Sequence, residues 1–350
     1  MRTETRNRSW GLCARCCALL ALACVQPRQV SPQALTRAPE YKPKTQVQGT
    51  IRIWGHGALG HDFITSLMVA LEDGFRKQQP RIVFDNELHG TASAMGALYT
   101  GTGDIALLGR DILPVEVEAF EDVFHHPPLG IDIMTGSLDI RNKEFALVVY
   151  ANKKNPIQHL TTKQMERVFG GRDTVKTWGD LGLTDEWADA PVHVYGFEIH
   201  RGFGYLMQQR VFGGSAIWNP ELKEFGDVKR PGGTLLDAGQ RISDAVGEDP
   251  YGIGYSSLLY KNTAIKPLAL EATSGHFILP TKESVEDHSY PLEQVITCYI
   301  NRDPGKPIDA KLAEFFRYVL SRDGQEIVER AGGYLPLTAQ LSAHELRKLE

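Results

Sequence analysis

The hydrophobic pattern of this chain switches repeatedly between the period of a strand and that of a helix, and this alternation limits the fold more than any other feature. Residues 51–54 indicate a short strand, residues 105–108 are a continuous apolar run, and residues 82–88 alternate between apolar and polar types. Residues 64–75 place apolar side chains at helical spacing. This β-α-β-α-β order predicts a mainly parallel sheet covered by helices, which is an α/β fold.

A second α/β set follows the first. Pro114 predicts a helix start, and Thr161 with Gln164 forms a capping box at the start of a further helix. Gly332 marks the end of a last predicted helix. The other predicted elements are strands at 145–151, 192–195, 252–258 and 295–300, and helices at 202–211, 236–246 and 309–320.

Length and charge narrow the function classes. The 350 residues, of which 42% are hydrophobic, are enough for two domains with cores of their own. The net charge is −5, but the first 23 residues hold four arginines and one glutamate, so the rest of the chain carries −8. Nucleic-acid binding needs a broad basic surface, and the acidic body contains no run of Lys or Arg. We therefore expect no nucleic-acid partner.

The first residues have the pattern of an export signal. A basic start precedes the apolar run 16–25, which is much shorter than the roughly 20 residues that span a bilayer. We expect residues 1–24 to be a signal peptide, and two processing outcomes stay open: cleavage after Ala23, or a lipid anchor at Cys24. Residues 25–48, rich in Pro, Gln, Thr and Lys, are expected to be a flexible tether. The protein would be periplasmic, or a membrane-anchored lipoprotein that faces outside the cytoplasm.

The cysteines and histidines give no sign of a catalytic or metal centre. Four of the five cysteines lie in the signal region, and Cys298 alternates with its neighbours like a buried strand residue. No H-E-x-x-H, G-x-S-x-G or P-loop motif is present. We expect no enzyme, no metal and no cofactor; the alternative is an exported phosphatase-like enzyme that uses some of the eleven histidines.

Four loops at predicted strand ends or helix starts suit a small anion, namely 55–58, 90–93, 109–111 and 199–202. A helix start offers unpaired N–H groups, and small residues let an oxyanion approach the backbone. An arginine can grip a tetrahedral anion with two parallel hydrogen bonds. Asp111 and Asp104 are expected to orient Arg110 or to accept a proton from a protonated ligand, with a turn at a strand start as the alternative role of Asp104. The candidate ligand-binding residues are His56, Gly57, Thr91, Arg110, His200 and Arg201.

Two consecutive segments, 90–98 and 103–110, resemble the part of periplasmic phosphate-binding proteins in which a Gly-Ser/Thr loop opens a helix and the next strand ends in Ser-Arg or Ser-Asp. Later landmarks follow in the same order as in that family, and the resemblance covers about residues 50–338. These landmarks are 145–157, 160–162, 168–171, 178–182, 195–196, 252–255 and 290–292.

The resemblance implies a type II periplasmic-binding-protein fold: two α/β lobes joined by two crossover strands, with the ligand cleft between them. The first lobe would contain Thr91 and Arg110, and the second His200 and Arg201. The protein would capture phosphate or a related oxyanion and deliver it to the permease of an ABC importer, as a monomer. The alternative on the same fold is a non-transport sensor or adhesive protein. The implied boundaries are 49–146 with 262–338 for lobe 1, 147–261 for lobe 2 and 339–350 for a C-terminal tail, with crossovers at 145–151 and 295–301.

The chain departs from the family pattern where the ligand would lie. It has His56-Gly57-Ala58 in place of Gly-Ser-(Ser/Thr), Gly109 in place of Ser, and 200–202 in place of Ser-Gly-Thr. If His200 and Arg201 point inward, they replace the missing hydroxyl donors and favour phosphate, phosphonate, sulfate or a phosphorylated solute. If they point outward, the anion site is lost, so the exact ligand stays open.

Overall fold

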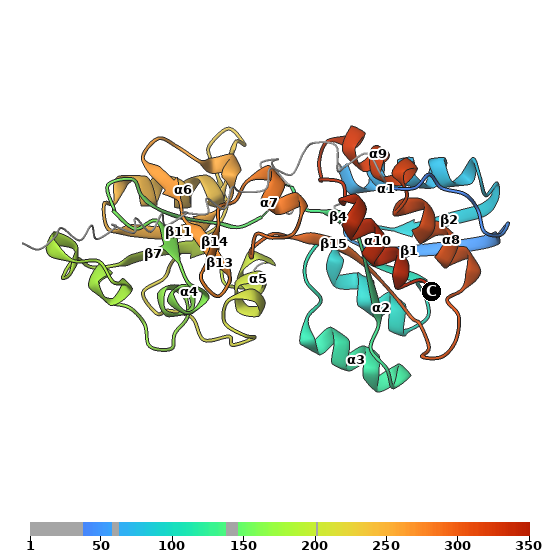
Figure 1. Cartoon of the computed structure of the whole chain (residues 1–350), viewed down its shortest axis with the longest axis horizontal. Coiled ribbons are helices and arrows are strands. Elements are labelled where there is room, and N and C mark those ends of the chain that lie inside the picture. Colours follow the sequence, from blue (N-terminus) through green and yellow to red (C-terminus); the bar gives the residue numbers. More distant parts are fainter. Residues whose placement is uncertain (1–37, 58–62, 138–145, 201) are drawn as a thin grey trace, which may run out of the picture. The chain divides into compact units, whose positions relative to one another are not determined.

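Two five-stranded mixed sheets, each with its own hydrophobic core, organise the computed structural model (Figure 1), which describes residues 38–57, 63–137, 146–200 and 202–350. We call the part built on the first sheet lobe 1 and the part built on the second lobe 2. The buried core of lobe 2 contains residues from Ala146 to Leu292, and that of lobe 1 contains residues on either side of this range. The prediction of two α/β lobes is confirmed.

The sheet of lobe 1 has the order β2-β1-β3-β15-β4. Strands β2, β1 and β3 are parallel, whereas β15 runs antiparallel to both of its neighbours. The second connection between the lobes leads into β15, so the sheet is mixed. The bounds are β1 Gln48–Gly55, β2 Arg81–Glu87, β3 Ile105–Leu108, β4 Leu129–Thr135 and β15 Val295–Ile300.

Helices cover both faces of this sheet (Figure 1). Ile105 and Leu107 of β3 join the core beneath α1, α8 and α9, whereas Ala106 and Leu108 join a smaller core beneath α2 and α3. Alternate strand residues point to opposite faces, so a fully apolar strand is the one that is buried on both sides. The bounds are α1 Phe63–Arg76, η2 Thr91–Ser93, α2 Ala94–Tyr99, α3 Pro114–Phe124, α8 Ala310–Val319, α9 Arg322–Ala331 and α10 Ala339–Arg347.

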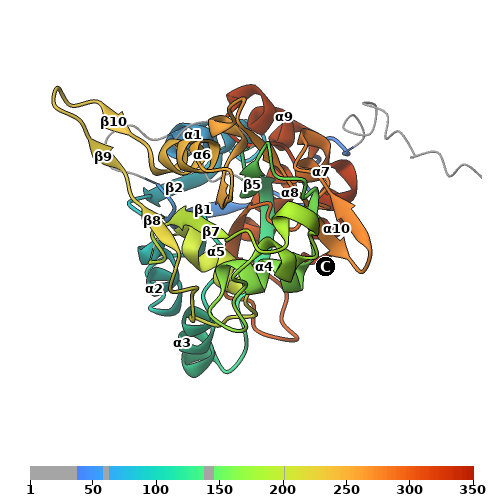
Figure 2. The same ribbon diagram turned by 90° about the vertical axis from the view of Figure 1, so that its left-hand side faces the viewer.

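The sheet of lobe 2 has the order β12-β5-β11-β7-β8, with α6 on one face and α4 and α5 toward the other (Figure 1). The short strands β14, β13 and β6 form a second sheet, and β9 with β10 forms a ribbon that extends away from β8 (Figure 2). The strands are β5 Val148–Asn152, β6 His159–Leu160, β7 His193–Phe197, β8 Lys223–Phe225, β9 Val228–Lys229, β10 Leu235–Leu236, β11 Gly252–Ser256, β12 Ile265–Pro267, β13 Ala269–Thr273 and β14 His276–Ile278. The helices are α4 Thr162–Phe169, η3 Trp178–Leu181, η4 Asp185–Trp187, α5 Gly202–Arg210, α6 Ala238–Glu248, η5 Leu258–Tyr260 and α7 Lys282–Glu286.

Helix ends are set by the local signals that the sequence carries. Thr161 and Gln164 form the expected capping box, with the Gln164 amide donating to Thr161 Oγ1 at 3.1 Å and the Thr161 amide donating to Gln164 Oε1 at 2.9 Å. Asp309 caps α8, and Gly332 ends α9 with a φ of 71°. These boundaries follow from side-chain chemistry within a few residues, so the pattern alone was sufficient to place them.

The lobe boundaries differ from the expected ones. Residues 262–292 were expected in lobe 1, but β12 pairs with β5 of lobe 2, and Leu270, Val285 and Leu292 lie in the lobe 2 core. Residues 339–350 are not a tail, because they form α10, and Leu349, which follows this helix, is buried in the lobe 1 core. Apolar periodicity predicts that a segment is buried but not which sheet buries it.

The expected tether and signal lie partly outside the described residues. Residues 1–37 are not described, so the structure does not bear on the predicted signal peptide or on the first part of the tether. Its last part is packed: Tyr41 and Val47 are buried in the lobe 1 core. The amide of Val47 also donates to Gln79 Oε1 at 2.9 Å, which holds this segment on the fold before β1 begins.

The two connections between the lobes run side by side. The Gly136 amide donates to the Gln294 carbonyl at 2.7 Å, and the Leu147 amide donates to the Leu292 carbonyl at 2.9 Å. The first connection leads into β5 and the second into β15, which are the two strands expected at the crossovers. The chain therefore passes twice through the same region between the two cores.

Candidate functional site

Three of the four predicted loops meet at the carboxyl edge of the lobe 1 sheet. The His56 amide donates to the Leu107 carbonyl at 2.8 Å, and the Gly90 amide donates to the Gly55 carbonyl at 2.8 Å. The Gly109 amide donates to Thr91 Oγ1 at 3.3 Å. These bonds join the ends of β1 and β3 to the start of η2, where an open α/β sheet presents its loops to a ligand.

The backbone at Gly55 lies so close to β3 that no side chain fits at this position. Its φ is +129°, and a Cβ there would lie 2.2 Å from the Leu107 carbonyl oxygen. The backbone of the 55–57 loop can therefore approach that of β3, and Gly57, the last residue of this loop, is half-buried. The site in lobe 1 is built mainly from backbone held at close range.

The imidazole of His56 lies over Gly109. A Cβ at position 109 would lie 2.4 Å from His56 Nδ1, so any larger residue there would displace the ring. On its other side, His56 Nε2 lies 3.0 Å from the hydroxyl of Tyr334, which follows α9. The two departures from the family pattern in lobe 1, His56 and Gly109, are therefore spatially coupled: the imidazole occupies the space that a serine at 109 would need.

Arg110 is held by a carboxylate from its own lobe. Its Nη1 and Nη2 atoms donate to the two carboxylate oxygens of Glu116 at 2.8 and 2.7 Å, and the side chain is 18% exposed. Glu116 Oε2 also accepts from the Leu113 amide at 2.9 Å at the start of α3. Neither carboxylate orients Arg110 as expected: Asp104 pairs with Arg52 and the Asp111 carboxylate with Arg210, and Asp111 contacts Arg110 only through its carbonyl, which accepts from Arg110 Nη1 at 2.9 Å.

Of the two site residues predicted in lobe 2, the structure describes His200. His200 is exposed in the turn after β7, and no contact between it and the lobe 1 loops is found among the described residues. Arg201 lies outside the described residues. Helix α5 starts at Gly202, and Gly204 packs closely on Ile199, where a Cβ would lie 2.2 Å from the carbonyl oxygen. The structure brings His56, Gly57, Thr91 and Arg110 together and does not place His200 with them.

Comparison with known proteins identifies the family. The PBP superfamily domain matches residues 42–323, which is most of the chain and takes in both lobes. The chain belongs to the PBP superfamily. The fold-level resemblance that the sequence motifs suggested is thereby confirmed.

Individual relatives agree with this PBP superfamily assignment. A phosphate-binding protein PstS of Pseudomonas aeruginosa is 29% identical over 319 residues, covering 89% of this chain and 90% of that protein. Among solved structures, PstS of Borrelia burgdorferi aligns with a TM-score of 0.56 at 16% identity, covering 83% of this chain and 100% of that one. An ABC-type phosphate transport receptor of Vibrio cholerae aligns with a TM-score of 0.52 at 17% identity, covering 81% and 99%. The name phosphate-binding protein PstS recurs among the curated relatives.

Residues that the sequence did not single out surround the lobe 1 loops of this PBP superfamily member. Arg210, at the end of α5, pairs with Asp111 at 2.8 Å and with Glu293 at 3.4 Å. Burial raises the pKa of Glu293 to about 7; Asp111 adds to this rise and Arg210 opposes it. No local motif indicates this contact, because Arg210 is 99 residues from Asp111 and has the pattern of an ordinary cation at a helix C-terminus.

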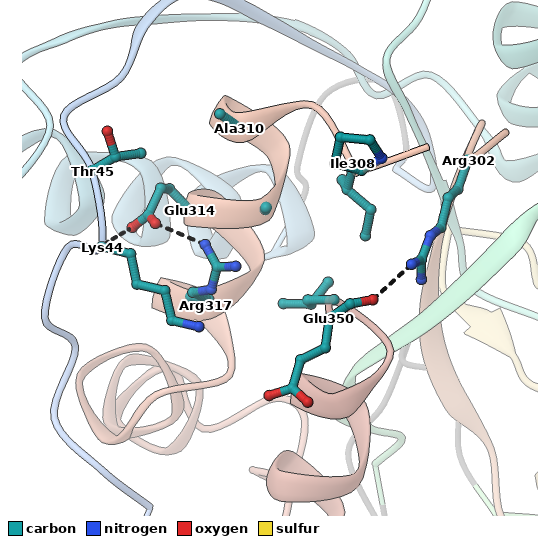
Figure 3. Close-up of a pocket in the computed structure, with 11 residues that line it drawn as sticks. Lys44, Thr45, Arg302, Ile308, Ala310, Glu314, Arg317 and Glu350 are labelled. Carbon is teal, nitrogen blue, oxygen red and sulfur yellow. Dashed lines mark hydrogen bonds and ion pairs between the residues drawn. The ribbon is translucent and has the colours of Figure 1, made fainter. Parts of the chain in front are cut away.

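A cavity of about 260 Å³ lies elsewhere in lobe 1, beside α8 (Figure 3). Glu314 pairs there with Arg317 at 2.7 Å and accepts from the Lys44 amide at 3.3 Å, while Arg302 donates to the Glu350 carbonyl at 2.7 Å. The bonds of Lys44 and Glu350 tie the segment before β1 and the residues after α10 to the lobe. None of the predicted ligand-binding residues is among those that line it: Lys44, Thr45, Arg302, Pro307, Ile308, Ala310, Ala313, Glu314, Arg317, Leu349 and Glu350.

The described part of the chain offers neither a metal site nor a membrane-spanning helix. It contains no group of three or more His, Cys, Asp or Glu side chains that could hold a metal ion. Within the same residues, no helix has the length and apolar character needed to cross a membrane.

Proposed function

We propose that this protein captures phosphate or a related oxyanion between its two lobes and delivers it to the permease of an ABC importer. The observation that carries the proposal is the convergence of the 55–57, 90–93 and 109–111 loops at one sheet edge, in a chain of the PBP superfamily. Its similarity to a phosphate-binding protein over 89% of its length supports phosphate as the first ligand to test.

In this proposal, lobe 1 supplies hydrogen-bond donors that are already positioned. The Thr91 hydroxyl, the His56 imidazole and the backbone of the 55–57 loop lie together, and Arg110 lies next to the Gly109 amide that binds Thr91. Glu116 forms an ion pair with Arg110, so recognition there would depend on the direction of hydrogen bonds more than on net charge. A tetrahedral oxyanion with several acceptor oxygens suits this set.

Lobe 2 would complete the site by closing on the bound anion. His200 and Arg201 directly precede in sequence the helix α5, which starts at Gly202, and the unpaired amides and dipole of a helix start favour an anion. A ligand that contacts both lobes stabilises the closed arrangement by its differential affinity for it. A micromolar dissociation constant corresponds to about −8 kcal/mol, which several charge-assisted hydrogen bonds can supply.

The proposal includes export. Residues 1–24 would direct the chain out of the cytoplasm, and either cleavage after Ala23 or lipidation of Cys24 would follow. Mass spectrometry of the protein purified from a membrane and from a soluble fraction separates the two outcomes. A fatty-acylated peptide that begins at Cys24 indicates the anchor, and a free amino terminus at residue 24 indicates release.

The deciding experiment is calorimetric titration together with thermal unfolding against phosphate, phosphonate, sulfate, molybdate and tungstate. A ligand at 1,000 times its dissociation constant stabilises the folded state by about 4 kcal/mol. We expect stabilisation by phosphate, with weaker binding by Arg110→Ala and Arg201→Ala and no change in Arg167→Ala, whose side chain pairs with Asp173 within lobe 2. If none of the five anions binds, oxyanion capture is rejected while the fold assignment remains.

A further inference from the structure

Arg210 lies at the meeting point of both lobes and their second connection. It is the last residue of α5, and its neighbours in sequence, Met207, Val211 and Phe212, are buried in the lobe 2 core. The side chain leaves this anchored position and is 31% exposed. Its backbone therefore belongs to lobe 2, while its guanidinium reaches residues outside that core.

The guanidinium makes a two-pronged contact with the 109–111 loop of lobe 1. Nε donates to Asp111 Oδ2 at 2.8 Å, and Nη2 donates to Asp111 Oδ1 at 3.0 Å. This parallel pair of bonds fixes the direction of the carboxylate as well as its distance, which a lysine could not do. Asp111 directly follows Arg110, a predicted ligand residue.

The third donor of Arg210 reaches the second connection. Nη1 lies 3.4 Å from Glu293 Oε2, whose side chain is only 8% exposed. Glu293 is followed by Gln294, whose carbonyl accepts from the Gly136 amide of the first connection at 2.7 Å. One side chain of lobe 2 thus contacts a lobe 1 loop and the segment through which the chain passes between the lobes.

Each residue of the 109–111 loop bonds to a different part of the structure. Gly109 donates to Thr91, Arg110 donates to Glu116, and Asp111 accepts from Arg210. The first two restraints are internal to lobe 1. The third is the one that makes the loop's position depend on lobe 2.

We propose that Arg210 is a positioning residue that couples the two lobes, holding the 109–111 loop in place for oxyanion capture without contacting the ligand. Its consequence for binding rests on the proposed function, whereas its effect on the loop does not. Loss of the two hydrogen bonds between Arg210 and Asp111 would let the 109–111 loop move relative to Thr91 and His56. Phosphate affinity would then fall although every ligand residue is retained.

The test uses the full-length protein and begins without ligand. Hydrogen exchange measured by mass spectrometry is compared for wild type, Arg210→Gln and Arg210→Lys. The matched control is Arg167→Gln, because Arg167 bonds to Asp173 and to the Asp180 carbonyl within lobe 2. We expect faster exchange in peptides that cover 109–112 and 292–296 for Arg210→Gln, a smaller increase for Arg210→Lys, and wild-type exchange there for Arg167→Gln. Unchanged exchange of the 109–112 peptide in Arg210→Gln would overturn the proposal.

Phosphate titration of the same proteins tests the coupling. We expect Arg210→Gln to weaken binding within the roughly 5- to 150-fold range typical of coupled sites, and Arg167→Gln to bind as wild type. A loosened loop with unchanged phosphate affinity would refute the link to capture. If wild type itself binds no phosphate, the proposed function fails, and the exchange comparison still decides whether Arg210 positions the loop.

Discussion

The packing of His56 on Gly109 can be tested by adding a single methyl group. In Gly109→Ala, the new Cβ would lie 2.4 Å from Nδ1, 2.5 Å from Cε1 and 2.8 Å from Cγ of the imidazole. These atoms include the base of the ring as well as its edge, so the whole ring has to swing away. The φ of Gly109 is outside the left-handed region, so alanine adds no backbone strain of its own.

Two effects lower the free energy of unfolding in Gly109→Ala, and a third raises it. Overpacking costs about 1–3 kcal/mol, and displacement of the ring loses the 3.0 Å contact between His56 Nε2 and the Tyr334 hydroxyl, a hydrogen bond of about 1 kcal/mol. Replacing glycine by alanine recovers about 0.4–1 kcal/mol through the unfolded chain. We therefore expect Gly109→Ala to lower the free energy of unfolding by about 1–3 kcal/mol.

The assay is a double-mutant cycle with His56→Ala, measured by equilibrium urea unfolding followed by circular dichroism. Without the imidazole there is no clash, so Gly109→Ala should cost close to nothing in the His56→Ala background. The coupling energy should then be about 1–3 kcal/mol. The control is Gly96→Ala in α2, where the nearest atom to a new Cβ is 3.6 Å away and the change should be neutral or stabilising. Additive effects of the two substitutions, within about 0.5 kcal/mol, would refute the packing argument.

Three other substitutions or treatments test the environment of single residues. Burial raises the pKa of Glu72 from 4.5 to about 7, although a hydrogen bond from Asn86 lowers it. Between pH 4.5 and 7 the unfolded chain releases a proton that the folded chain keeps, so the free energy of unfolding falls as the pH rises through this range. Glu72→Gln should lack this loss of up to about 3 kcal/mol, and equal slopes of stability against pH in urea titrations from pH 5 to 8 would contradict the assignment. Burial also raises the pKa of the Cys298 thiol far above its ordinary value, so iodoacetamide at pH 8 should leave Cys298 unmodified in the folded protein and alkylate it in urea, as mapped by peptide mass spectrometry. Thr161→Ala should lower the unfolding free energy by about 1 kcal/mol in urea titrations, because the cap on the Gln164 amide is lost, while Thr161→Ser should retain most of it.

Several features of the fold could be predicted from the residues alone because their causes are local. The strands 105–108 and 295–300 have the bounds that their apolar runs indicated, and the cap at Thr161 has the expected bonds. Membership of the PBP superfamily was likewise evident from consecutive loop motifs. In each case the determining interactions lie within one element or one turn.

The candidate site was only partly predictable. The convergence of His56, Thr91 and Arg110 follows from their positions after parallel strands or before a helix, which place them at one sheet edge. The partner of Arg110 did not follow, because Asp104, Asp111 and Glu116 all lie near it in sequence and only the side-chain directions in the fold separate them. The residues 262–292 were placed in the wrong lobe for a similar reason: strand patterns do not specify their sheet.

The sequence by itself determined the α/β class, the family and the identity of the loops at the lobe 1 sheet edge, because periodicity and small-residue loops are properties of contiguous segments. The tertiary structure alone decided that the imidazole of His56 fills the space above Gly109, and that Arg210 of one lobe holds Asp111 of the other. Such contacts join residues 53 and 99 positions apart. Their geometry depends on how two sheets and two connections pack, which no local pattern encodes.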